Sequence, residues 1–165
     1  MSVTEVVKDL GTCSMTITAE FDEPIDRVWQ LWADPRQLER WWGPPTYPAT
    51  FFTHELTAGG LVTYCMTGPE GDQPKGLWRV VEVQAPKRLV VEDAFADDSW
   101  RPVPGMPVTV MQVDLVEKAP SGTRASIRST FASVEAMQQL LDMGMDEGMR
   151  LAMEQMDDIL LDAGQ

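Results

Sequence analysis

The chain has 165 residues, of which 44% are hydrophobic and 24% charged, a composition typical of one globular domain. Its formal net charge of −13 argues against nucleic acid and anionic membranes as partners, because both are bound through clustered Lys and Arg. No apolar run reaches the ~20 residues of a membrane span, so we expect no membrane insertion.

The first residues and the cysteines favour a cytoplasmic protein without a metal centre. The opening residues MSVTEVVKDLGTCSM have neither the basic start nor the apolar core of a secretion signal. Cys13 and Cys65 lack a CxxC or Cys/His spacing, so we expect reduced thiols. His54 is the only histidine, which excludes a His-rich metal site, and no motif indicates a cofactor. Residues 1–12 have no strong pattern and are expected to form a flexible arm before a single domain of residues 13–165.

One strand opens the predicted domain, and two short helices follow it. Residues 13–21, CSMTITAEF, alternate between apolar and polar side chains, which is typical of a half-buried strand. The segment DEP at 22–24 stops this strand, and residues 25–32 place apolar side chains, two of them Trp, on one helical face. Asp34 ends that helix and caps a second one over residues 35–42.

Six further segments then read as strands, separated by turns rich in Gly and Pro. These segments are residues 49–56, 61–67, 76–84, 88–95, 108–117 and 123–131. Because most connections are short, we expect sequential strands to pair antiparallel as a meander. The exception is the proline-rich segment 96–107, whose length is typical of a functional loop.

The last predicted element is one uninterrupted amphipathic helix over residues 133–162, begun by a serine N-cap. Its apolar stripe contains Gly144 and Gly148, each of which costs about 1 kcal/mol relative to Ala in a helix. The glycines either let the helix approach a sheet closely, with flexible Met filling gaps, or open an apolar cavity lined by Met145 and Met149. A sheet of about seven strands is too wide for two short helices to cover. The order therefore predicts an α+β fold whose curved antiparallel sheet wraps around the last helix.

This order of elements resembles the START-like superfamily, also called SRPBCC. More narrowly it resembles the bacterial branch related to activators of the ninety-kilodalton heat-shock protein ATPase. The resemblance covers about residues 12–163. It is carried by EPIDRVWQLWADPRQLERWWGPP (23–45), ELTAGG (55–60), GLWRVVEVQAPKRLVVEDAF (76–95), GTRASIRSTF (122–131) and MGMDEGM (143–149). The resemblance implies the helix-grip fold, with an apolar cavity between the sheet and the C-terminal helix.

Three functions are compatible with this resemblance, because a fold does not fix a function. Relatives with such a cavity hold small hydrophobic ligands, and we expect the same here. The first alternative is a chaperone-interaction module, since the eukaryotic co-chaperone uses its domain to stimulate a chaperone ATPase. The second is an enzyme similar to polyketide cyclases.

The candidate ligand contacts are mainly aromatic side chains and methionines expected around the cavity. They are Trp42, Phe52, Tyr64, Trp78, Asp93, Phe95, Met145 and Met149. Trp42 is expected at the mouth between the second helix and the sheet, and Trp78 is expected to face inward. Tyr64 could orient a ligand through its hydroxyl. Trp100, in the proline-rich segment, could be either a lid over the opening or a local anchor of its loop.

An enzyme of this fold would need a buried acid or base with a shifted pKa in the cavity. The candidates are His54, Glu55, Glu82, Glu92 and Asp93. Adjacent residues on a strand point to opposite faces, so at most one of Glu92 and Asp93 faces inward, and Asp93 is the stronger candidate. A lone His on a strand is more often structural than catalytic. The sequence therefore assigns no catalytic residue.

Overall fold

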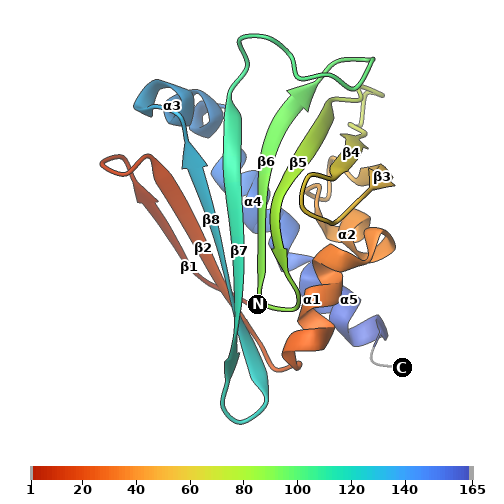
Figure 1. Cartoon of the computed structure of the whole chain (residues 1–165), viewed down its shortest axis with the longest axis vertical. Helices are drawn as coiled ribbons and strands as arrows, with labels where there is room; N and C mark the ends of the chain where they lie inside the picture. Colours follow the sequence, from red (N-terminus) through yellow and green to blue (C-terminus); the bar gives the residue numbers. More distant parts are fainter. Residues whose placement is uncertain (1, 164–165) are drawn as a thin grey trace.

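The computed structural model describes residues 2–163, which contain one eight-stranded antiparallel sheet. The strands are β1 (Val3–Asp9), β2 (Ser14–Phe21), β3 (Ala49–His54), β4 (Leu61–Met66), β5 (Lys75–Gln84), β6 (Arg88–Ala96), β7 (Val108–Lys118) and β8 (Gly122–Phe131). Their spatial order is β1-β2-β8-β7-β6-β5-β4-β3 (Figure 1). Every pair of neighbours except β2 and β8 is consecutive in sequence, which confirms the predicted meander.

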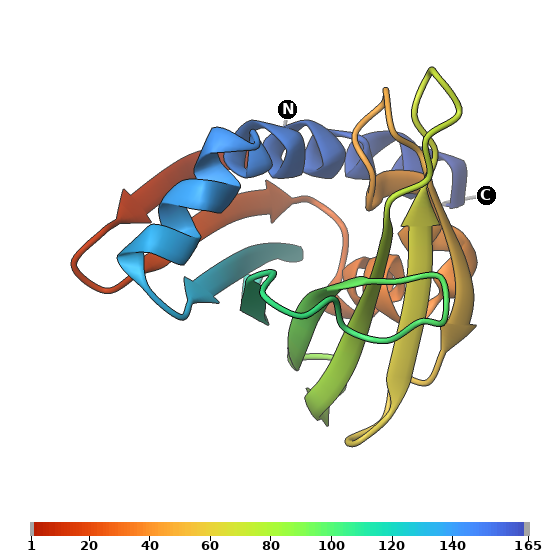
Figure 2. The ribbon, with the colours of Figure 1, turned by 90° about the horizontal axis from the view of Figure 1, so that it is seen from above.

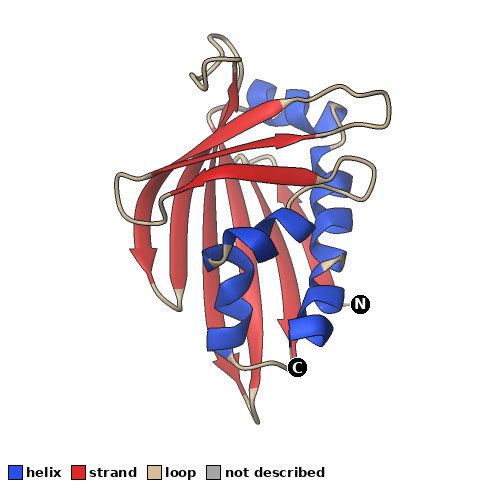
Figure 3. Ribbon diagram, turned by 90° about the vertical axis from the view of Figure 1, so that its right-hand side faces the viewer, coloured by secondary structure: helices blue, strands red, loops and turns tan. Residues whose placement is uncertain are grey.

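Residues 2–163 also form five helices. They are α1 (Ile25–Ala33), α2 (Pro35–Trp41), α3 (Val134–Asp142), α4 (Met145–Glu154) and α5 (Met156–Ala163). Figure 2 shows that the sheet bends strongly and that α4 and α5 run across its open side. Figure 3 shows α1 and α2 packed on that same side. This arrangement is the predicted helix-grip fold.

Local sequence signals explain the first strand and the two short helices. On β2, Met15, Ile17, Ala19 and Phe21 are buried and alternate with partly exposed residues from position 16 onward, as half-buried strands do. Between the two helices, the Asp34 side chain accepts a hydrogen bond from the backbone N–H of Arg36 at 2.9 Å. This N-cap, with proline in the first turn of α2, starts the second helix where the sequence predicts it.

Residues 3–9 correct the prediction of a flexible arm over residues 1–12. They form β1, which pairs antiparallel with β2 at the edge of the sheet; Met1 lies outside the described residues. Most side chains of β1 are exposed. The strand therefore lacks the regular alternation of apolar and polar residues from which a half-buried strand is predicted. The sheet accordingly has eight strands where the sequence indicates about seven.

The single helix predicted over residues 133–162 is instead three helices. Ser133 caps α3 as expected, accepting a hydrogen bond from the backbone N–H of Ala136 at 3.0 Å. Gly144 then adopts a φ of +84°, in the left-handed region that interrupts a helix, and α4 continues in a new direction (Figure 2). A second interruption at Gln155 separates α4 from α5. Helical periodicity could not reveal the break, because the apolar stripe continues through it.

Four tryptophans form a buried chain of edge-to-face contacts in the core. Ring centroids are 5.3 Å apart for Trp32 and Trp41, 5.6 Å for Trp41 and Trp42, and 4.9 Å for Trp42 and Trp78. The indole N–H of Trp41 donates a hydrogen bond to the Leu31 carbonyl at 2.8 Å. Edge-to-face pairs are favourable beyond their buried area, so this chain fixes the position of Trp42 at the end of α2.

Candidate ligand-binding pocket

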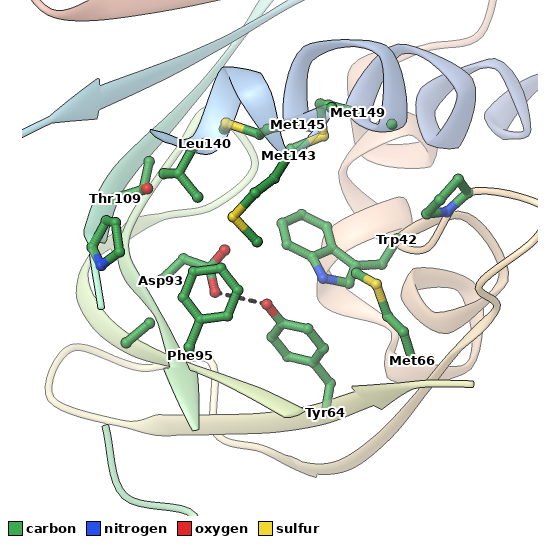
Figure 4. A pocket seen from close by; sticks show the side chains of 15 residues that line it. Trp42, Tyr64, Met66, Asp93, Phe95, Thr109, Leu140, Met143, Met145 and Met149 are labelled. Atoms are coloured by element: carbon green, nitrogen blue, oxygen red, sulfur yellow. Dashed lines mark hydrogen bonds between the residues drawn. The ribbon is translucent and has the colours of Figure 1, made fainter. Parts of the chain in front are cut away.

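A pocket of about 290 Å³ lies between the sheet and the α3–α4 junction (Figure 4). Its sheet wall consists of Tyr64 and Met66 on β4, Asp93–Phe95 on β6 and Thr109 on β7. Apart from Tyr64, Asp93 and Thr109, the side chains of this wall are apolar. The pocket therefore combines an apolar surface with a small number of polar groups, as ligand sites commonly do.

Tyr64 and Asp93 meet across an intervening strand. The Tyr64 hydroxyl donates a hydrogen bond to Oδ1 of Asp93 at 2.8 Å, although β5 separates β4 from β6. The residue of β5 that pairs with Tyr64 is Gly76. A Cβ at that position would lie 2.4 Å from Cζ and Oη of Tyr64, so the absence of a side chain lets the phenol ring cross β5 and reach Asp93.

Burial raises the pKa of Asp93 to about 7, and the hydrogen bond from Tyr64 opposes this rise. Burial also raises the pKa of Tyr64 well above its usual value, and the neighbouring Asp93 raises it further. Asp93 keeps some accessible surface, and it lines the pocket. Near neutral pH the pocket thus holds a carboxyl group that can exchange a proton.

The opposite wall comes from the α3–α4 junction. It consists of Leu140, Met143, Gly144, Met145, Gly148 and Met149. A Cβ added at Gly144 or Gly148 would meet no atom within 4 Å. The glycines therefore leave space beside the pocket and do not serve a close approach to the sheet. Flexible, polarizable methionines can adapt their shape to different contents.

Six of the eight sequence-predicted contact residues line this pocket. They are Trp42, Tyr64, Asp93, Phe95, Met145 and Met149. Trp78 faces inward but does not line the pocket; it is fully buried and packs against Trp42 with ring centroids 4.9 Å apart. It therefore supports the wall from behind.

The prediction for Phe52 is wrong. Its side chain is 60% exposed, and the neighbouring Phe51 is the buried residue, with its ring centroid 5.2 Å from that of Tyr64. Two adjacent phenylalanines on a strand must face opposite sides, and the sequence alone did not show which one faces the core. Trp100 lies 5.4 Å from Phe52 between ring centroids and is not among the residues that line the pocket. This position, against Phe52 on β3 and away from the pocket lining, favours the second of the two roles considered for Trp100, a local anchor of its loop.

The other acid and base candidates do not reach the pocket. Nε2 of His54 lies 3.0 Å from the Trp32 carbonyl, so His54 has a structural hydrogen bond. Glu55 accepts a hydrogen bond from the backbone N–H of Leu61 at 3.1 Å, and Glu82 is hydrogen-bonded to Gln84. Glu92 lines a separate groove beside Arg79. Within residues 2–163, no group of three or more His, Cys, Asp or Glu side chains is placed to hold a metal ion.

Sequence reasoning missed several lining residues because they come from different parts of the chain. Met66 could have been found, since it lies two residues after Tyr64 on the same face of β4. Thr109 and Leu140 carry no local signal, and neither do the other lining residues Pro44 and Pro107. Only the curvature of the sheet brings these positions together.

Comparison with known proteins identifies the family. The family model described as "Activator of Hsp90 ATPase homolog 1-like protein" matches residues 22–161. The chain belongs to this family. The crystal structure of protein Ms6760 from Mycobacterium smegmatis is 47% identical over 96% of each chain, with a TM-score of 0.88. The solution structure of a protein from Arthrobacter aurescens is 50% identical over 98% of this chain and 93% of its own, with a TM-score of 0.92.

A more distant solved structure shares the fold alone. CalU16 from Micromonospora echinospora is 20% identical over 87% of this chain and 63% of its own, with a TM-score of 0.55. No curated protein matches the chain. Family membership thus agrees with the START-like resemblance read from the sequence. In the described part of the chain, no helix has the length and apolar character needed to cross a bilayer.

Proposed function

We propose that this protein binds a small hydrophobic molecule in the pocket between the sheet and the α3–α4 junction. The observation that carries this proposal is the largely apolar pocket of about 290 Å³ with the Tyr64–Asp93 pair in its wall. The volume is close to the lower end of typical small-molecule sites, roughly 300 Å³. A compact aromatic or short aliphatic compound fits such a space better than a long lipid.

The composition of the helical wall supports the same proposal. A helix that only needed to pack on the sheet would be more stable with Ala than with Gly at position 148, by about 1 kcal/mol. The open space beside Gly148 is therefore better explained by contents of the pocket than by packing of the helix. Met145 and Met149 on either side can change rotamer to follow a ligand.

The test compares the wild type with Gly148→Leu and Gly148→Ala. Leu at this position extends into the pocket but also favours the helix, so the variant is expected to fold. A panel of small hydrophobic compounds is titrated and followed by NMR chemical shifts of the methionine methyl groups. We expect saturable binding by the wild type and by Gly148→Ala, and a loss of at least about tenfold in affinity for Gly148→Leu. Equal affinities for all three proteins, or no binding by the wild type, would contradict the proposal.

A second candidate function is proton transfer on the bound molecule. It is favoured by one observation, the carboxyl group of Asp93 with a pKa of about 7 inside the pocket, because a general acid or base works best near the operating pH. The measurement is turnover of polyketide-like carbonyl compounds by the wild type and by Asp93→Asn. Catalysis that survives Asp93→Asn unchanged would rule out this role.

Stimulation of a chaperone is the alternative that the family description supports, since it refers to an activator of Hsp90 ATPase. The measurement is the ATPase rate of a purified bacterial Hsp90 at increasing concentrations of this protein. A saturable increase would support the alternative, and a constant rate would contradict it.

A further inference from the structure

We infer that the ligand is a neutral molecule with an apolar body and one hydrogen-bond-accepting oxygen, and that the carboxyl group of Asp93 binds this oxygen as a donor. The inference rests on the proposed ligand binding and adds the chemical class of the ligand. It follows from the charges around the pocket, from the geometry of Asp93 and from the groups that surround it.

The charges of the lining residues disfavour an anionic ligand. Among the described residues that line the pocket, Asp93 is the only carboxylic acid and none is a Lys, Arg or His. A ligand carboxylate would therefore stand next to an acid without a counter-charge, in a site where burial already penalises negative charge. The net charge of −13 also disfavours the binding of an anion. Fatty acids and other organic acids are thus excluded from the preferred class.

The geometry of Asp93 leaves one oxygen for the ligand. Oδ1 accepts the hydrogen bond from Tyr64 at 2.8 Å, and the described residues provide no hydrogen-bond partner for Oδ2. Figure 4 shows the carboxyl group of Asp93 projecting into the pocket below Met143. When protonated, this carboxyl group can donate one hydrogen bond from Oδ2 while Oδ1 keeps Tyr64 as its donor.

The strands around Asp93 contain one other titratable group that faces it. That group is Tyr64 on β4. The residues that pair with Asp93 are Trp78 on β5 and Thr109 on β7, and neither carries a charge.

The helical wall adds no charge that faces Asp93. The residues of α4 that line the pocket are Met145, Gly148 and Met149. The three acids of α4 are paired elsewhere: Asp146 with Lys8, and Glu147 and Glu154 with Arg150. No cation therefore compensates the ionised form of Asp93, and burial keeps its carboxyl group protonated up to about pH 7.

A hydrophobic amine is the competing class, and the site suits it less well. An ammonium group would have to lose its water and pair with an ionised Asp93, and such buried ion pairs gain little unless further hydrogen bonds satisfy both partners. Beyond Asp93, the polar groups of the lining side chains are the hydroxyl groups of Tyr64 and Thr109 and the indole N–H of Trp42. Because the indole N–H can only donate, an ammonium group would be left with few acceptors. A ketone, ester or similar neutral oxygen needs only the one donor that Asp93 supplies.

The test uses four probes with the same naphthalene body. They are 2-acetylnaphthalene, 2-ethylnaphthalene, 2-naphthoate and 2-(aminomethyl)naphthalene, titrated into the full chain by calorimetry at pH 6 and at pH 8. We expect the ketone to bind about threefold to tenfold more tightly than the ethyl compound at pH 6, and to lose this advantage at pH 8 as Asp93 ionises. The naphthoate is expected to bind most weakly at both values. If the naphthoate binds as tightly as the ketone, or if the amine binds most tightly and improves from pH 6 to pH 8, the inference is wrong.

Two variants separate this inference from the proposed function. Asp93→Asn keeps a donor of similar shape without a titration, so the advantage of the ketone is expected at both pH values. Glu92→Gln removes the neighbouring charge on the opposite face of β6 and is expected to behave like the wild type. If the ethyl compound and the ketone bind equally at both pH values, ligand binding stands but this inference fails. If none of the four probes binds, both fail.

Discussion

Gly76 on β5 lies directly beneath the phenol ring of Tyr64 on β4. The two residues are cross-strand partners, and a Cβ at position 76 would be 2.4 Å from both Cζ and Oη of Tyr64. This close contact carries the hydroxyl across β5 to its hydrogen bond with Asp93 at 2.8 Å. A single glycine on the sheet thus determines where the polar group of the pocket forms.

The substitution Gly76→Ala is expected to destabilise the protein by about 1–3 kcal/mol, because the added methyl group overpacks the space beneath the ring. The measurement is the free energy of unfolding in urea. The control is the same substitution in a Tyr64→Ala background, where no ring stands above position 76. There the cost is expected to fall below about 1 kcal/mol; an equal cost in both backgrounds would show that the ring is not the cause.

The substitution of Ala for Gly is expected to have opposite effects at positions 144 and 148. Gly144 has a φ of +84°, so Ala is strained there and should lower the free energy of unfolding by about 1 kcal/mol. Gly148 lies inside α4 with open space at its Cβ position, so Ala should raise stability by about 0.5–1 kcal/mol through helix propensity. Thermal unfolding of the two variants measures the difference. A shift of the same sign in both would contradict the break between α3 and α4.

The stability of Asp93→Asn relative to the wild type is expected to depend on pH. The pKa of Asp93 is raised from 3.8 to about 7, so between these values the unfolded chain releases the proton while the folded chain keeps it. The folded state therefore loses stability relative to the unfolded state as pH rises through this window. Asn removes the titration, so the two proteins should be equally stable near pH 4. Near pH 8 the variant should be more stable, on the order of 4 kcal/mol.

Urea unfolding at intervals from pH 4 to pH 8 measures the free energy of unfolding of both proteins. Because the two proteins share all other acids, the contribution of those acids cancels in the difference. A matched control is Glu92→Gln, which removes a charge at the next position of β6. A constant difference between Asp93→Asn and the wild type across this range would show that Asp93 ionises in the folded protein as it does in the unfolded chain.

The substitution Tyr64→Phe is expected to raise the pKa of Asp93 above about 7, because the hydrogen bond from Tyr64 is what lowers it against the effect of burial. The ring should stay in place, since it stacks on Phe51 with centroids 5.2 Å apart. The carboxyl carbon shift of Asp93, followed by NMR as a function of pH, reports the change. The control is Tyr47→Phe, because Tyr47 donates to Asp72 at the surface and should leave the titration of Asp93 unchanged. If the pKa of Asp93 falls in Tyr64→Phe, the hydrogen bond from Tyr64 does not lower this pKa and the prediction is wrong.

Most of the fold was predictable from local pattern, and the exceptions have physical reasons. The alternation of buried residues on β2 and the N-cap at Asp34 depend only on residues that are close together in the sequence. The edge strand β1 escaped detection because it buries few side chains. The break at Gly144 escaped because glycine is compatible with both helical and left-handed backbone, and the surrounding structure selects between them.

The sequence by itself determined the strand meander, the two short helices and the apolar, methionine-rich character of the last segment. It also indicated that Glu92 and Asp93 face opposite sides, since adjacent strand residues always do. The tertiary structure alone decided which side is the pocket. It buried Phe51 and exposed Phe52, and it brought Tyr64 across Gly76 to Asp93. The physical reason is that burial and hydrogen bonding of Asp93 depend on the curvature of the whole sheet, which no local run of residues encodes.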